Sequence, residues 1–202
     1  FKTEGIQPHE DWHFAHNVDL LISTLIYLDR IEDAAKLTGN LCADEKSIET
    51  CLTAVHVQIG TGNLSTAENL MDHRLKGYRN HPFFVSLKIL IALARKDFAK
   101  AETLVASLKS TDDFAEESSA YARVAYEVLL QNRSEIDALE TLEKKLKQPG
   151  FDSWSFNVYQ SRALMRVFRD NGRTEFADKI KSLSIAAFEN TRCKTEVCKA
   201  NR

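Results

Sequence analysis

Three histidines and one glutamate near the start of the chain have the spacing of a zinc site. The sequence from His9 to His13 is HEDWH, and His16 follows about one helical turn later. Residues four apart share one face of a helix, so His9 and His13 could coordinate zinc while Glu10 acts as general base on a water molecule. One alternative is therefore a zinc-dependent hydrolase or a metal-binding protein that uses residues 9–16.

Two features favour an accidental match to this motif. Proteases that carry it usually hold their substrate at a sheet edge, and this chain shows no strand pattern. Pro8 is expected in the first turn of a helix, which places His9 where a helix frays, whereas a metal ligand must be held rigidly. We interpret the motif as accidental, expect neither enzymatic activity nor a cofactor, and keep zinc at His9, His13 and His16 as the alternative.

A row of arginines near the end of the chain is the second candidate site. Arg162, Arg166 and Arg169 follow the i, i+4, i+7 spacing of one helix face, and Arg173 comes just after them. Guanidinium groups bind carboxylates through two parallel hydrogen bonds. The row predicts a binding site for an acidic segment or a free C-terminal carboxylate; the alternative is a solvated charged face with Arg166 paired to Asp170.

The helices that would carry these residues show a repeated phrase: a turn, a bulky apolar residue, and then alanine and leucine at three-residue steps. The three clearest copies begin at Ile31, Leu64 and Phe98, and their alanines are 33 and 34 residues apart. Looser copies read Ile136-x-x-Leu139-x-x-Leu142 and Thr174-x-x-Ala177-x-x-Ile180. A period in the thirties is typical of stacked helical hairpins.

The pattern predicts five hairpins and no strand. Their helices are expected at 8–28 and 31–38, 44–59 and 64–78, 81–95 and 98–109, 112–130 and 135–147, and 152–169 and 174–190. The small alanine in each second helix lets the two helices of a hairpin approach closely, so a larger side chain there should damage packing. The positions concerned are Ala34, Ala67, Ala101 and Ala177.

Two of the copies, Gly62-Asn63-Leu64-x-x-Ala67 and Asp97-Phe98-x-x-Ala101, resemble the second helix of a tetratricopeptide repeat. The first helices match that family less well, because its small mid-helix residue corresponds here to Ile22, Val55, Ile89 and Met165. The resemblance implies an all-α fold, a right-handed α-α superhelix or solenoid of four to five helix-turn-helix hairpins. We expect one such domain over residues 1–190 and a basic tail over 191–202.

The resemblance also implies a concave groove lined by the first helix of each hairpin. Registered on the alanines, the groove positions are His16, Asp19 and Ser23; Glu49, Leu52 and His56; Phe83, Ser86 and Leu90; Arg123 and Glu127; and Tyr159, Arg162, Arg166 and Arg169. We expect a groove that is apolar in the middle and basic at its C-terminal end. The predicted partner-binding residues are Arg123, Tyr159, Arg162, Arg166 and Arg169.

The overall composition excludes several classes. Of 202 residues, 44% are hydrophobic and 28% charged, and the formal net charge is −2, which argues against a general nucleic-acid binder. No apolar run is long enough to span a bilayer. The four cysteines form two close pairs, Cys42 with Cys51 and Cys193 with Cys198, which permits two disulfides or four thiols. The chain starts at Phe1, so we expect a processed piece, with cytoplasmic and periplasmic or secreted locations both open.

These observations together predict a non-enzymatic protein–protein interaction module, or scaffold. It would bind a peptide or protein segment in the concave groove, as part of a regulator or of an assembly or secretion factor. The zinc-dependent hydrolase is the alternative from another class. A homodimer formed through the apolar end surfaces is a third interpretation.

Overall fold

The computed structural model describes residues 12–38, 48–108, 113–146 and 153–192, and all of the elements in these ranges are helical. At 12–16, 48–50, 113–118, 153–157 and 188–192 it describes the backbone alone. The helices are α1 (Trp12–Tyr27), α2 (Ile31–Thr38), α3 (Ile48–Thr61), α4 (Leu64–Arg74), α5 (Pro82–Ala94), α6 (Phe98–Ser107), α7 (Asp113–Leu130), α8 (Glu135–Leu146), α9 (Ser153–Asp170) and α10 (Thr174–Arg192). A short 3-10 turn, η2 (Lys76–Tyr78), follows α4. The predicted all-α class is confirmed.

Consecutive helices pair into five hairpins, and four of the five turns share one backbone conformation. A residue one or two positions beyond the end of the first helix has a positive φ: Asp29 (60°), Gly62 (87°), Lys96 (60°) and Gly172 (77°). In each turn the next amide donates to the carbonyl five residues earlier, as Asn63 does to Gln58 at 2.9 Å. This is the Schellman ending of a helix, and it reverses the chain in a few residues.

The repeated alanines pack between the helices, as their spacing predicts. Five alanines at the same place in α2, α4, α6, α8 and α10 are 0% exposed: Ala34, Ala67, Ala101, Ala138 and Ala177. The amide of each donates to the carbonyl four residues earlier, in the preceding turn. The fourth copy was predicted one residue out of register, because Ala138 and not Leu139 occupies the buried position. Ile136, which the looser copy placed inside, is 70% exposed.

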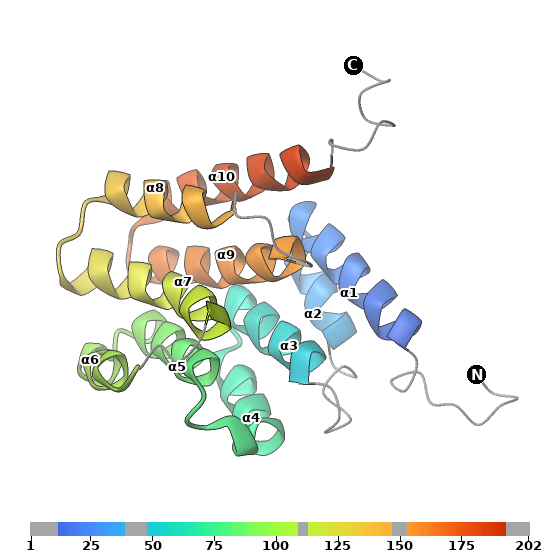
Figure 1. Cartoon of the computed structure of the whole chain (residues 1–202), viewed down its shortest axis with the longest axis horizontal. Coiled ribbons are helices and arrows are strands. Elements are labelled where there is room, and N and C mark those ends of the chain that lie inside the picture. The colour runs from blue at the N-terminus through green and yellow to red at the C-terminus, as the bar shows by residue number, and fades with distance from the viewer. Residues whose placement is uncertain (1–11, 39–47, 109–112, 147–152, 193–202) are drawn as a thin grey trace, which may run out of the picture.

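Helix α9 is the centre of the molecule (Figure 1). Besides its hairpin partner α10, it contacts α1, α3, α5, α7 and α8. In an open solenoid each repeat contacts its neighbours only. Here the last hairpin reaches back to the first, so the first helices of all four earlier hairpins contact α9. The right-handed superhelix stays a prediction, whereas the closure through α9 is a direct observation.

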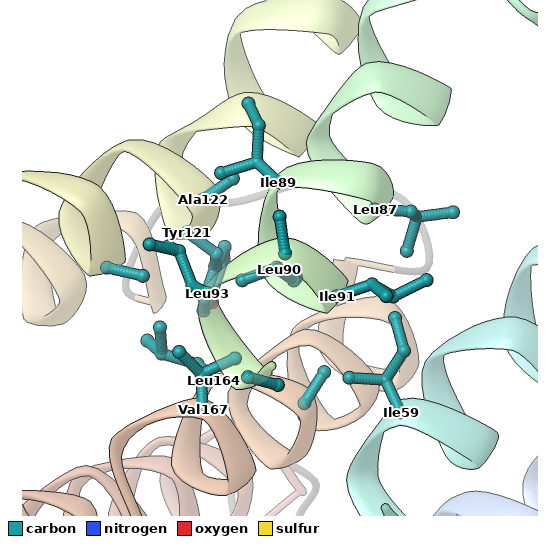
Figure 2. Packing of buried hydrophobic residues seen from close by; sticks show 14 of the residues in the cluster. Ile59, Leu87, Ile89, Leu90, Ile91, Leu93, Tyr121, Ala122, Leu164 and Val167 are labelled. Atoms are coloured by element: carbon teal, nitrogen blue, oxygen red, sulfur yellow. The ribbon is translucent and has the colours of Figure 1, made fainter. Parts of the chain in front are cut away.

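Two groups of buried apolar side chains hold this arrangement. The larger one joins α3 through α10, and Figure 2 shows its centre, where Leu90 and Leu93 of α5 lie near Tyr121 of α7 and Leu164 of α9. The smaller one joins α1 and α2 to α9, with Ile22 and Tyr159 at 0% and 1% exposure. Both groups include residues of α9, which therefore forms part of each.

Candidate functional site

Five of the positions predicted to line the concave groove lie around one small cavity, together with a residue of α9. Leu52 and His56 of α3, Phe83, Ser86 and Leu90 of α5, and Gln160 of α9 surround one cavity of about 10 Å³. That volume is about the room of a single water molecule. The middle of the expected groove is therefore filled by protein in this structure, with α9 in the place that a bound segment would take.

His56 and Gln160 are buried polar residues that line this filled region, and Ser161 is a buried neighbour on α9 that lines a separate cavity. Burial lowers the pKa of His56 to about 4, so the imidazole is neutral at pH 7, and its Nδ1 lies 2.9 Å from the carbonyl of Leu52. The side-chain amide of Gln160 and the hydroxyl of Ser161, both on α9, are 1% exposed and form no hydrogen bond in the described part of the chain.

Tyr159 lies inside the molecule and is 1% exposed. Its hydroxyl donates to Asp19 of α1, with 2.7 Å to the carboxylate Oδ1 and 2.8 Å to the backbone carbonyl. Thr53 of α3 donates to the same carboxylate at 3.3 Å. Burial and then the charge of Asp19 raise the pKa of Tyr159, so the hydroxyl keeps its proton. Tyr159, one of the predicted partner-binding residues, therefore joins α9 to α1, and Asp19 connects this pair to α3.

Arg162 belongs to an internal clamp. Its side chain is 12% exposed and its Nη1 lies 2.7 Å from Oδ1 of Asp29, in the turn between α1 and α2. Lys181 of α10 reaches the other oxygen of Asp29 at 2.9 Å. A hydrogen bond from Lys181 is the main cause that lowers the pKa of Asp29, with the charge of Arg162 acting in the same direction. The clamp ties the first hairpin to the last.

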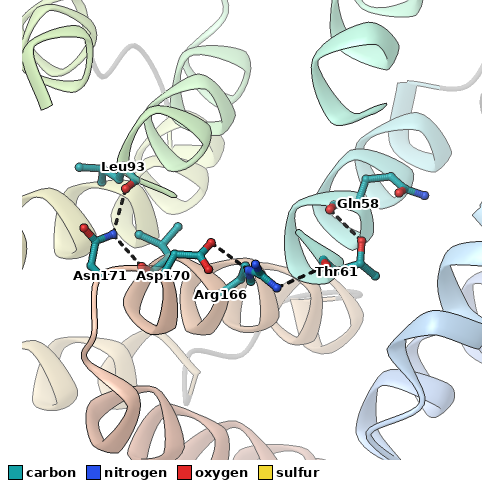
Figure 3. A network of polar contacts seen from close by, with 7 residues as sticks. Gln58, Thr61, Leu93, Arg166, Asp170 and Asn171 are labelled. Carbon is teal, nitrogen blue, oxygen red and sulfur yellow. Dashed lines mark hydrogen bonds and ion pairs between the residues drawn. The ribbon is translucent and has the colours of Figure 1, made fainter. Parts of the chain in front are cut away.

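Arg166 connects the C-terminal ends of two helices (Figure 3). Its Nε donates to Asp170 at 2.8 Å, as the predicted i, i+4 alternative has it, and its Nη1 lies 3.4 Å from the carbonyl of Thr61, the last residue of α3. Asn171 makes the equivalent connection to α5 by donating to the carbonyl of Leu93 at 2.9 Å. A cation at a helix C-terminus is favourable because the unpaired carbonyls there are partly negative.

Three further arginines are more accessible than Arg162. Arg169 pairs with Asp178 at 2.8 Å and keeps 36% of its side chain exposed, and Arg173 pairs with Glu135 at 3.4 Å with 54% exposed. Arg123 is exposed on α7, and its Nη2 lies 3.5 Å from the carbonyl of Leu108. Binding of a partner by the arginine row stays a prediction; the structure shows which internal contacts a partner would have to replace.

The predicted zinc ligands lie at the edge of what the structure describes. His9 is outside the described residues, and His13 and His16 are in α1 where the backbone alone is described. Among the side chains that are described, no three histidine, cysteine or carboxylate residues group closely enough to hold a metal ion. Cys51 is disulfide-bonded, and the other three cysteines lie outside the described ranges. The interpretation of four free thiols is therefore wrong for Cys51.

A groove between α8 and α10 was missed by the sequence interpretation. It has a volume of about 750 Å³ and opens on the side of the molecule formed by second helices. The residues that line it are Ile136, Leu139, Glu140, Glu143, Glu175, Asp178, Lys179, Ser182 and Leu183. The signal that could have found it is the alanine register: with Ala138 inside, Ile136 must point away from the hairpin interior, and Leu139 lies at the edge of the core.

Within the described ranges, no helix is both long and apolar enough to cross a bilayer, as was expected. Comparison with known proteins adds no relationship: no protein-family model, no curated protein and no solved structure matches this chain. What the chain does is therefore inferred from its own residues and their arrangement.

Proposed function

We propose that this chain is a non-enzymatic interaction module that binds a segment of another protein. We further propose that its five hairpins form a tetratricopeptide-like superhelical stack. The five buried alanines and the four shared turns support repetition of one hairpin unit. Disulfides persist in oxidising compartments, so the disulfide at Cys51 favours the periplasmic or secreted location of the two that the sequence leaves open.

The observation that carries the proposal is the groove between α8 and α10. Its lining includes Ile136, which at 70% exposure is the most exposed large apolar side chain among those that the structure describes. Apolar side chains in a hollow bounded by polar ones are typical of protein-binding surfaces, because burying them on association is favourable. The groove is open in the structure, so a segment can dock there without moving any helix.

A position-specific cross-link tests this proposal. A photoreactive amino acid replaces Ile136 in one variant and Leu28, another exposed apolar residue at 56%, in the matched control. We expect irradiation in source-cell extract to join position 136, and not position 28, to one segment of a partner, and a synthetic peptide of that segment to compete. Equal labelling from both positions, or none from either, would contradict docking in the groove.

The arginine row offers a second docking position. Arg169 and Arg173 are held by exposed ion pairs, which are typically worth about 0–1 kcal/mol and so exchange easily for a partner's carboxylate. Arg162 is unsuitable for a test, because a glutamate there would face Asp29 inside the clamp and destabilise the fold. The informative variant combines Arg169→Glu with Arg173→Glu. If this variant stays folded and no longer binds an acidic partner, the result supports a binding site at the basic end of the arginine row. Unchanged binding of that partner would exclude this site.

A further inference from the structure

The groove between α8 and α10 is built from one face of each helix. The α8 residues 136, 139, 140 and 143 and the α10 residues 175, 178, 179, 182 and 183 all follow three- and four-residue steps. Leu139 and Leu183 are half-buried against the core, and Ile136 stands exposed beside them. The result is a trough with an apolar floor that runs between two helices, the shape that receives one face of a third helix.

Carboxylates dominate the rim of this trough. Glu140, Glu143, Glu175 and Asp178 line it, with Lys179 as the one lysine among the lining residues. Asp178 is paired with Arg169, whereas Glu140 and Glu175 are exposed and form no ion pair with any side chain that the structure describes. The rim is therefore negative in excess, and it would repel an acidic segment.

We propose that this groove binds a basic amphipathic helix of a partner protein. The inference rests on the proposed function and adds the chemistry of the partner. Apolar side chains of the partner helix, spaced i, i+3, i+4 and i+7, would cover Ile136, Leu139 and Leu183 of this chain. Lysine or arginine side chains on both flanks would reach Glu140 on α8 and Glu175 on α10. The apolar contacts supply most of the affinity, and the carboxylates select the sign of the partner's charge.

The test uses three fluorescent helical peptides of about 15 residues that share one leucine face and carry lysine, glutamine or glutamate on their flanks. Binding to the full chain is followed by fluorescence anisotropy. The charge-reversed variant is Glu140→Lys, and its matched control is Glu102→Lys, an exposed glutamate on α6. We expect the lysine peptide to bind most tightly, Glu140→Lys to weaken it about three- to tenfold, and Glu102→Lys to leave it unchanged within about twofold.

The outcomes separate the partner chemistry from the docking itself. If all three peptides bind alike and Ile136→Ser weakens them equally, the groove docks a segment but a basic partner is excluded. If none binds, or if Ile136→Ser has no effect on binding, the groove is not a helix-docking site at all. If sedimentation shows a dimer of the wild-type chain that Ile136→Ser abolishes, the occupant is a second copy and the basic partner is excluded.

Discussion

The closure of the molecule through α9 makes a quantitative prediction for Arg162→Met. Methionine keeps much of the aliphatic stem and removes the guanidinium that pairs with Asp29 at 2.7 Å. Exposed ion pairs contribute about 0–1 kcal/mol, and breaking a fully buried one costs about 3–5 kcal/mol. This pair lies between these limits, because the Arg162 side chain is 12% exposed and that of Asp29 is 51% exposed.

Two features make the loss of stability in Arg162→Met smaller than the loss from breaking a fully buried ion pair. Water reaches the half-exposed carboxylate of Asp29, and Lys181 continues to pair with it at 2.9 Å after the arginine is removed. We therefore expect Arg162→Met to lower the free energy of unfolding by about 1–2 kcal/mol. Urea denaturation followed by circular dichroism measures this, and in a chain of this size each 1 kcal/mol moves Tm by about 2–4 °C.

The control for this prediction is Arg173→Met. Arg173 also joins two hairpins, but its pair with Glu135 is 3.4 Å long and its side chain is 54% exposed. We expect a loss of no more than about 0.5 kcal/mol there. A double-mutant cycle of Arg162→Met with Asp29→Asn should show positive coupling of about 1 kcal/mol. Equal losses at Arg162 and Arg173, or no coupling to Asp29, would refute the clamp between the first and last hairpins.

Three further predictions concern packing, a turn and pH. Ala101→Leu should cost about 1–3 kcal/mol in urea denaturation, because the alanine is 0% exposed between helices. Gly62→Ala should lower Tm, since its φ is 87° and a Cβ there would lie 2.6 Å from Cζ of Arg166. Burial lowers the pKa of His56 from 6.5 to about 4, so the unfolded chain binds a proton first. The contribution of His56 to the free energy of unfolding should therefore be fully present above pH 6.5. It should decrease as the pH falls toward 4, by at most about 1.4 kcal/mol per pH unit.

Each of these predictions has a matched control. Ala99→Leu lies on the exposed side of the same helix α6 and should be nearly neutral, so an equal loss would contradict the buried-alanine explanation. Gly172→Ala has a φ of 77° and open space around the new Cβ, so it should cost less than Gly62→Ala. In His56→Leu the slope of stability between pH 4 and 6.5 should shrink, and an unchanged slope would assign it to other groups.

The local structure could be predicted from the sequence because it depends on residues close together in the chain. Helix α2 spans Ile31–Thr38, the predicted range of 31–38. The alanine period identified four of the five buried positions, since only a small side chain fits between closely packed helices. The fourth copy was out of register because Leu139 fits the three-residue spacing of apolar residues, whereas the buried position is taken by its neighbour Ala138. Helix α4 ends at Arg74, short of the predicted 78, and the 3-10 turn Lys76–Tyr78 follows.

The placement of α9 could not be predicted in the same way. A repeat period reports which helices are neighbours in sequence, whereas the curvature of the stack follows from side-chain volumes summed over every interface. Large residues such as Ile22, Val55 and Met165, all 3% exposed or less, occupy positions where the tetratricopeptide repeat that the sequence resembles has a small residue. Five of the residues expected in the concave groove line the small cavity beside Gln160 of α9, but no local pattern indicates that α9 packs against the first helices of all four earlier hairpins.

The bonds between the first hairpin and the last also constrain how the chain reaches its native state. Tyr159 and Asp19 are 140 residues apart in sequence, and Lys181 and Asp29 are 152 apart. Folding slows as contacting residues become more distant along the chain, because the intervening loop must close first. During synthesis the earlier hairpins leave the ribosome before α9 exists, so their faces toward α9 stay open to solvent until α9 has been synthesised. The last hairpin thus covers the apolar faces of the earlier ones, and a truncated chain that lacks it would present this uncovered apolar surface to other chains and to chaperones.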